Sequence, residues 1–215
     1  CTAPKMNLAG STVAIQGFGN AGGHLATLLK EDGAKIVAAS DSSGGIYEPK
    51  GLDPKVLHAH KNAGHHFKTL KLGRPVTNKQ LLELPVDILV PAALENQITG
   101  ENAGRIKAKI VAEAANGPTT PTADAVLFKK GRTVIPDILA NAGGVTVSYF
   151  EWVQDFSAFF WDEDEVDKRL ERSMVRAWKT VAETAALHKV SLRDAAYVVA
   201  VGRVAEATRV CGIFP

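Results

Sequence analysis

The sequence predicts an α/β protein, a Rossmann-type doubly wound parallel sheet with C-terminal helices. Three observations predict this class. Short apolar runs alternate with segments of helical spacing over residues 11–136, as in parallel strands joined by helical crossovers. The first run ends in glycines that open a helix. After residue 136 only helical patterns follow, so we expect a Rossmann core over residues 1–140 and a helical segment over residues 141–215.

The expected strands are short runs rich in β-branched residues. They cover residues 11–16, 35–40, 86–91, 109–113 and 132–136.

The helices of the core are predicted from apolar spacing and from their first residues. Asp53 and Pro54 are an N-cap and a first helical position, and Thr77 with Gln80 is typical of a capping box. We expect a turn-rich loop over residues 41–51. Helices are expected over residues 20–32, 77–84, 122–130, 145–160, 162–189 and 192–210.

Composition excludes several classes of protein. Of 215 residues, 46% are hydrophobic and 22% charged, and the net charge is +2, so a nucleic-acid-binding face is not expected. No run approaches the roughly 18 apolar residues of a membrane span. The two cysteines, Cys1 and Cys211, form no disulfide framework, and we expect a reducing, cytoplasmic location.

The strongest motif matches G-x-G-x-x-G between a strand and a helix. It runs through Gly17, Phe18, Gly19, Asn20, Ala21 and Gly22. The first glycine permits a tight turn, the second lets the backbone approach a pyrophosphate, and the third permits close packing of helix and strand. The free N–H groups and the positive end of the helix dipole then face the phosphates. The pattern predicts dinucleotide binding.

An acidic residue ends the next expected strand. Asp41 lies 19 residues after Gly22, where a carboxylate accepts hydrogen bonds from the adenosine ribose. A carboxylate repels a 2′-phosphate, which favours NAD. The hydroxyls of Ser40, Ser42 and Ser43 could hydrogen-bond a phosphate, so NADP stays possible.

The ends of the later strands are further candidates, because doubly wound sheets bind ligands beyond their carboxyl ends. Ala92 and Ala93 leave room for a cofactor over the sheet. Asn116 and Asn141 offer amide groups suited to the nicotinamide carboxamide or its ribose, although asparagine is also common in turns and caps. Four histidines, His58, His60, His65 and His66, lack zinc spacing, so no metal is expected.

Together these segments resemble the glutamate dehydrogenase family, within the glutamate, leucine, phenylalanine and valine dehydrogenases. The matching stretches are VAIQGFGNAG (13–22), SDSSGGIY (40–47), PAALENQIT (91–99), AEAANGPTTP (112–121), PDILANAGGVTVSYFEW (136–152) and RVAEATRVCGIFP (203–215).

The resemblance implies a C-terminal dinucleotide-binding domain only. In the family an N-terminal domain binds the amino acid and carries the catalytic Lys and Asp, so no catalytic residue and no turnover are expected of this chain alone. The pyrophosphate would meet residues 18–21, and Asp41 with Ser42 the adenosine ribose. Val145 and Ser148 would meet the substrate, with Ser148 on its γ-carboxylate.

Two alternatives remain open at this point. One is a nucleotide-binding module without chemistry, and the other is the cofactor domain of a leucine or phenylalanine dehydrogenase. The implied partners are the nicotinamide dinucleotide, L-glutamate or 2-oxoglutarate, the N-terminal substrate domain and further copies in a homo-oligomer.

Overall fold

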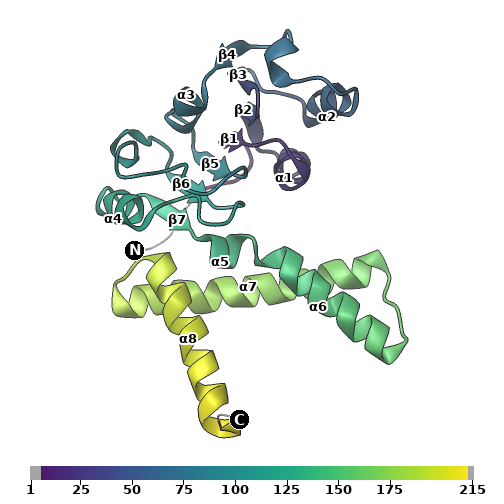
Figure 1. The fold of residues 1–215 in the computed structure, drawn as a ribbon, viewed down its shortest axis with the longest axis vertical. Helices are drawn as coiled ribbons and strands as arrows, with labels where there is room; N and C mark the ends of the chain where they lie inside the picture. The colour runs from purple at the N-terminus through teal and green to yellow at the C-terminus, as the bar shows by residue number, and fades with distance from the viewer. Residues whose placement is uncertain (1–5, 213–215) are drawn as a thin grey trace. The chain divides into compact units, whose positions relative to one another are not determined.

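The computed structural model describes residues 6–212. The described residues divide into two compact units, one up to residue 137 and one from residue 138 onward. We call them the Rossmann unit and the helical unit. Figure 1 shows a twisted sheet with helices in the first and long helices in the second.

The sheet of the Rossmann unit has the strand order β4-β3-β2-β1-β5-β6-β7. The strands β2, β1, β5, β6 and β7 are parallel, as expected from the sequence. Their bounds are β1 Thr12–Gln16, β2 Lys35–Asp41, β3 Gly44–Tyr47, β4 Arg74–Val76, β5 Ile88–Pro91, β6 Ile110–Ala112 and β7 Thr133–Ile135.

One expectation was wrong at the edge of the sheet. The turn-rich loop predicted over residues 41–51 contains β3, which pairs antiparallel with β2, and β4 pairs antiparallel with β3. An antiparallel strand needs only a short reversal after its neighbour, and Ser42 and Ser43 supply it. The sheet is therefore parallel with a two-stranded antiparallel edge.

Helices cover both faces of the sheet, so the sheet is doubly wound. One apolar cluster joins the sheet to α3, η2 and α4 through residues such as Leu81, Ala103 and Leu127. The other joins it to α1, α2 and η1 through Ala26 and Leu57 among others. The bounds are α1 Asn20–Glu31, α2 Pro54–Asn62, η1 Phe67–Thr69, α3 Asn78–Leu82, η2 Ala103–Arg105 and α4 Pro121–Lys129.

The predicted caps of the core helices are confirmed. Asp53 accepts a hydrogen bond from the Lys55 N–H at 3.0 Å at the start of α2. Thr77 and Gln80 form the reciprocal capping box of α3. Such caps satisfy backbone N–H groups that the first helical turn leaves without partners.

The helical unit contains α6, α7 and α8, with the short helix α5 spanning the division. The bounds are α5 Asp137–Ala140, α6 Ala142–Ser157, α7 Glu163–His188 and α8 Leu192–Cys211. Asp162 caps α7 and Ser191 caps α8 through backbone N–H groups. The helix α6 starts three residues earlier than the sequence predicted, and it also ends earlier, at Ala158 in the left-handed conformation. Among residues 6–212, no helix is long and apolar enough to cross a membrane.

Candidate dinucleotide-binding site

The site begins where the strand order reverses. The chain runs from β1 to β2 on one side and later returns to β5 on the other side of β1. Ligands of open α/β sheets bind at such a switch point, beyond the carboxyl ends of the strands. Here the turn after β1 and the segment after β5 meet at this point.

Two glycines of the turn are required by close approach. Gly17 has a φ of +93°, and a Cβ on it would lie 2.8 Å from the Ala93 Cβ and 2.9 Å from the Ala92 oxygen. A Cβ on Gly22 would lie 2.0 Å from the Gly17 oxygen. A methyl group fits in neither place, so the glycines form the tight turn and bring α1 against β1.

The N-terminus of α1 faces outward from this turn. Its N-cap is Gly19, whose Cβ position has no atom within 4 Å, and no described side chain caps the helix. Ser40 holds the turn in place through two hydrogen bonds. Its backbone carbonyl accepts from the Phe18 N–H at 2.7 Å, and its side-chain hydroxyl accepts from the Gly17 N–H at 3.1 Å. The first-turn N–H groups and the helix dipole thus present an anion-binding surface.

A cleft of about 770 Å³ opens beside this helix end. It brings together eight of the residues singled out from the sequence, namely Gly17, Gly19, Ser40, Asp41, Ser42, Ser43, Ala92 and Ala93. Asn20 and Ala21 are exposed in the same turn, and Gly22 is buried beneath it. The volume is in the range of small-molecule and cofactor pockets.

Polar residues that the sequence analysis missed also line the cleft. They are Gln16, Thr77, Asn78 and Gln97, with the apolar Leu94. The Gln16 amide nitrogen donates to the Asn78 Oδ1 and the Gln97 Oε1, both at 2.7 Å. Gln16 is only 3% exposed, and its Oε1 has no hydrogen-bond partner among the described residues. A buried acceptor of this kind calls for a donor, which a ligand in the cleft could supply.

Asp41 also lines the cleft, and its carboxylate accepts hydrogen bonds from the chain itself. Its Oδ1 accepts from the Ser43 N–H and hydroxyl at 2.8 and 2.6 Å, and its Oδ2 from the Phe67 N–H at 3.0 Å. Burial alone raises the pKa of this carboxyl. The hydrogen bonds from Ser43 and Phe67, with the charge of Lys61, outweigh burial and lower the pKa to about 2.

Phe18 reaches the site only through its backbone. Its side chain is 4% exposed and lies in the cluster under α1 and α2, away from the cleft. The prediction that Phe18 contacts a pyrophosphate therefore concerns its peptide group and not its ring.

Comparisons with known proteins agree with this geometry. The family model for glutamate, leucine, phenylalanine and valine dehydrogenases matches residues 2–212. The chain belongs to this family. A glutamate dehydrogenase of Thermotoga maritima is 54% identical over 206 residues, which cover 95% of this chain and 50% of that protein. A catabolic NAD-specific glutamate dehydrogenase of Bacillus subtilis is 49% identical, covering 96% and 49%.

A solved structure gives the same result for the fold. The crystal structure of the hetero-hexameric glutamate dehydrogenase from Thermus thermophilus matches with a TM-score of 0.90 and 36% identity. The matched region covers 98% of this chain and 50% of the Thermus thermophilus chain. The chain therefore spans about half the length of the relatives that it matches.

The remaining residues predicted from the sequence lie outside the cleft. Asn116 is exposed in the loop after β6 and is not among the residues that line the cleft. Asn141, Val145 and Ser148 belong to the helical unit, where Asn141 precedes α6 and the other two lie exposed on it, three residues apart. Residues three apart share a helix face, so Val145 and Ser148 can act on one ligand.

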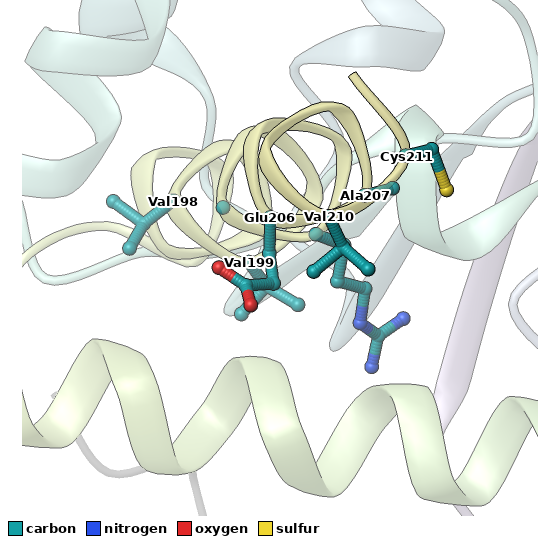
Figure 2. Close-up of a pocket in the computed structure, with 8 residues that line it drawn as sticks. Val198, Val199, Glu206, Ala207, Val210 and Cys211 are labelled. Atoms are coloured by element: carbon teal, nitrogen blue, oxygen red, sulfur yellow. The ribbon is translucent and has the colours of Figure 1, made fainter.

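A second hollow differs in kind from the cleft. It lies along α8 and is lined by Val198, Val199, Gly202, Arg203, Glu206, Ala207, Val210 and Cys211. Figure 2 shows Val199, Glu206 and Val210 projecting from one side of this helix. All its lining residues come from one helix, and they are mostly apolar. The hollow offers surface for packing and no cluster of groups for chemistry.

Proposed function

We propose that this chain is the NAD(P)-binding domain of a glutamate dehydrogenase. The parent reaction is the conversion of L-glutamate, NAD(P)⁺ and water to 2-oxoglutarate, ammonia and NAD(P)H. The observation that carries the proposal is the uncapped N-terminus of α1, which opens into a cleft at the switch point of the sheet. The relatives' names support the choice of reaction.

The proposed coenzyme follows the cleft. Residues 18–21 surround the pyrophosphate, and the N–H groups of Gly19, Asn20 and Ala21 hold it at the positive end of the α1 dipole, since the Phe18 N–H is bound to Ser40. The adenosine lies over Ala92 and Ala93, between Asp41 with Ser42 at the ribose and the amide network of Gln16, Asn78 and Gln97. The unpartnered Gln16 oxygen suits the exocyclic amino group of adenine.

Further residues are proposed for the nicotinamide end of the coenzyme and for the substrate. Asn116 and Asn141 hold the nicotinamide carboxamide or its ribose. Val145 and Ser148 meet the amino acid, and the Ser148 hydroxyl donates to the γ-carboxylate of glutamate. The bound nicotinamide supplies the hydride acceptor, and the protein supplies its position.

We propose NAD as the preferred coenzyme, with NADP possible. Relatives of Bacillus subtilis and Staphylococcus aureus are described as NAD-specific at 48–49% identity. The cytoplasmic location expected from the cysteines and assembly into a homo-oligomer belong to the same proposal. The Thermus thermophilus relative is a hetero-hexamer.

Calorimetric titration with NAD and NADP in parallel tests the proposal. We expect each coenzyme to bind with a stoichiometry of one per chain, and NAD to bind more tightly than NADP. Gly19→Ala should abolish binding without loss of stability, because its Cβ enters only open space at the phosphate position. Gly104→Ala is the matched control, since its Cβ also meets no atom within 4 Å and it lies in η2, outside the cleft. Absence of heat with both coenzymes would refute the proposal.

A dehydrogenase for leucine or phenylalanine is the second candidate, because the matching family model covers these substrates as well. The chain alone is expected to be inactive, so the test adds a separately produced substrate domain. Restored turnover favours the enzyme over a binding module without chemistry. Ser148→Ala should then impair glutamate far more than leucine.

A further inference from the structure

The carboxylate of Asp41 has no acceptor position left for a ligand in the described structure. In addition to Ser43 and Phe67, the Lys61 Nζ lies 3.4 Å and the His66 Nδ1 3.5 Å from its Oδ2. Each carboxylate oxygen accepts about two hydrogen bonds, and both oxygens are at that number. The Asp41 side chain is only 4% exposed. A ribose hydroxyl would have to displace one of these donors to bind it.

The same hydrogen bonds fasten the segment η1 to the end of β2. Asp41 accepts from the Phe67 N–H, and the Ser43 hydroxyl, which donates to Asp41, accepts from the Lys68 N–H at 3.3 Å. Two successive N–H groups of η1 are therefore bound by one turn. Phe67 is fixed in position at its backbone as a result.

Phe67 in turn contacts the phosphate-binding turn. Its side chain is fully buried, and its ring lies 5.4 Å from the ring of Phe18, centroid to centroid. The His58 ring packs on Phe18 from another direction at 5.0 Å, and its Nε2 lies 3.0 Å from the Gly23 oxygen. The Phe18 peptide is part of the proposed pyrophosphate site. A continuous path of contacts thus links Asp41 to the backbone that would hold the phosphates.

We propose that Asp41 is a positioning residue, which holds Phe67 against Phe18 and so fixes the phosphate-binding turn. This inference rests on the proposed function and replaces the expected ribose contact with an indirect role. It also changes the expectation for coenzyme choice. A carboxylate that is buried and paired with Lys61 does not repel a 2′-phosphate as an exposed one would. Replacing Asp41 should then affect NAD and NADP alike.

The first test measures how Asp41→Asn and the unsubstituted chain bind two nucleotides that differ only in the ribose hydroxyls. The probes are adenosine diphosphate and its 2′,3′-dideoxy analogue, titrated by calorimetry alongside NAD and NADP. We expect the Kd of all four to rise about tenfold in Asp41→Asn, because one charged hydrogen-bonding centre is lost. The ratio between the two diphosphates should stay as in the unsubstituted chain.

A direct ribose contact predicts the opposite pattern. Asp41→Asn would then weaken the diphosphate but not its dideoxy analogue, and would favour NADP over NAD. Either result, or no change in any Kd, overturns the proposal. Asp53→Asn is the control for loss of one negative charge, because Asn also caps helices and residue 53 lies outside the cleft.

Amide hydrogen exchange tests the path itself, independently of coenzyme binding. In Asp41→Asn the N–H groups of Phe67 and Lys68 should exchange faster, while those of α4 should not. Phe67→Leu should weaken binding in the same way, and the double substitution should be less than additive. Additive effects, or unchanged exchange at Phe67, would contradict the positioning role. If the unsubstituted chain binds no nucleotide while Asp41→Asn speeds exchange at Phe67 and Lys68, the proposed function fails and the structural link between Asp41 and η1 remains.

Discussion

The Rossmann unit and the helical unit differ in how much apolar surface they leave uncovered. In the Rossmann unit the large aliphatic residues of the parallel strands are nearly all buried between two layers of helices. The helical unit exposes Trp152 and Phe156 at 60% and 85%, and Val204 on α8 at 66%. Three rings lie in a row on α6: Tyr149 contacts Trp152 at a tilt, and Trp152 stacks on Phe156.

The difference follows from how strands and helices satisfy their backbones. A strand needs neighbours for its hydrogen bonds, so a parallel sheet forms only with its layers in place. A helix satisfies its own backbone and can present an apolar face to a partner. Exposed patches of this kind mark interaction surfaces. The exposed faces of α6 and α8 are therefore candidate interaction surfaces.

The largest expected effect separates the cores of the two units. Leu57 on α2 is fully buried, and Leu57→Ala should destabilise the Rossmann unit by about 2–5 kcal/mol through the cavity that it leaves. Val204→Ala on α8 should change stability by about 0.5 kcal/mol or less, since the side chain is mostly exposed. Urea unfolding measures both. Equal losses would show that the exposed face of α8 is covered in this chain.

The next effect separates folding from binding within the Rossmann unit. Gly22→Ala places a methyl group against the Gly17 oxygen. It should lower the free energy of unfolding by about 1–3 kcal/mol and should also abolish coenzyme binding. Gly19→Ala should lose binding with an unchanged melting temperature. Thermal unfolding with and without NAD measures the two variants. A stable Gly22→Ala that still binds NAD would show that the turn is looser than described.

Acid should destabilise the Rossmann unit more than the helical unit. The side-chain hydrogen bond from Lys109, with the Thr12 N–H, lowers the pKa of Asp87 from 3.8 to about 2, and Asp41 is lowered to about 2 as well. Both groups stabilise the fold fully above their unfolded pKa, and this stability is lost as the pH falls through the folded pKa. Between pH 4 and pH 2 the loss is about 2 kcal/mol from Asp41 and, after solvent screening, about 1 from Asp87.

The pH dependence of urea unfolding checks this window. Asp87→Asn should be less stable at pH 7 and should lose less stability on acidification than the unsubstituted chain. Glu206 on α8, which also has a lowered pKa because Arg209 donates to it, is fully exposed and should add little. An unfolding free energy independent of pH between 4 and 2 would contradict the buried contacts of Asp41.

The smallest effect on stability is expected on α6. Phe156→Ser removes the most exposed aromatic ring of the stack and should change the free energy of unfolding by about 0.5 kcal/mol or less. Phe156→Ser should reduce self-association of the chain at high concentration, because it interrupts the exposed row of aromatic rings on α6. Sedimentation velocity measures this. A large loss of stability would show that the ring is buried in solution.

Local patterns predicted much of this fold. Asp53, Thr77 and Ser191 cap the helices that the sequence indicated, because a cap depends on residues a few positions away. The strand β3 was missed because Gly44 and Gly45 are typical of a loop. Gly45 is in fact packed closely, with its Cβ position 3.0 Å from a Val76 methyl group.

The sequence predicted the parts of the candidate site that lie within one short motif. It did not predict contacts between residues that are far apart in the chain. The glycine turn follows from one short motif. The partners of Gln16 lie 62 and 81 residues away, and the N–H that Asp41 binds in η1 lies 26 residues away. Only the folded sheet brings such residues together. Sequence reasoning therefore singled out Asp41, which lines the cleft, but could not give the contacts of its carboxylate.

A crystal structure of the chain soaked in NAD tests the central claim most directly. We predict density for the pyrophosphate against the N–H groups at the start of α1, with Gly19 beneath it and the adenosine over Ala92 and Ala93. An empty cleft at saturating NAD, or a coenzyme bound elsewhere with side chains filling this helix end, would contradict the account.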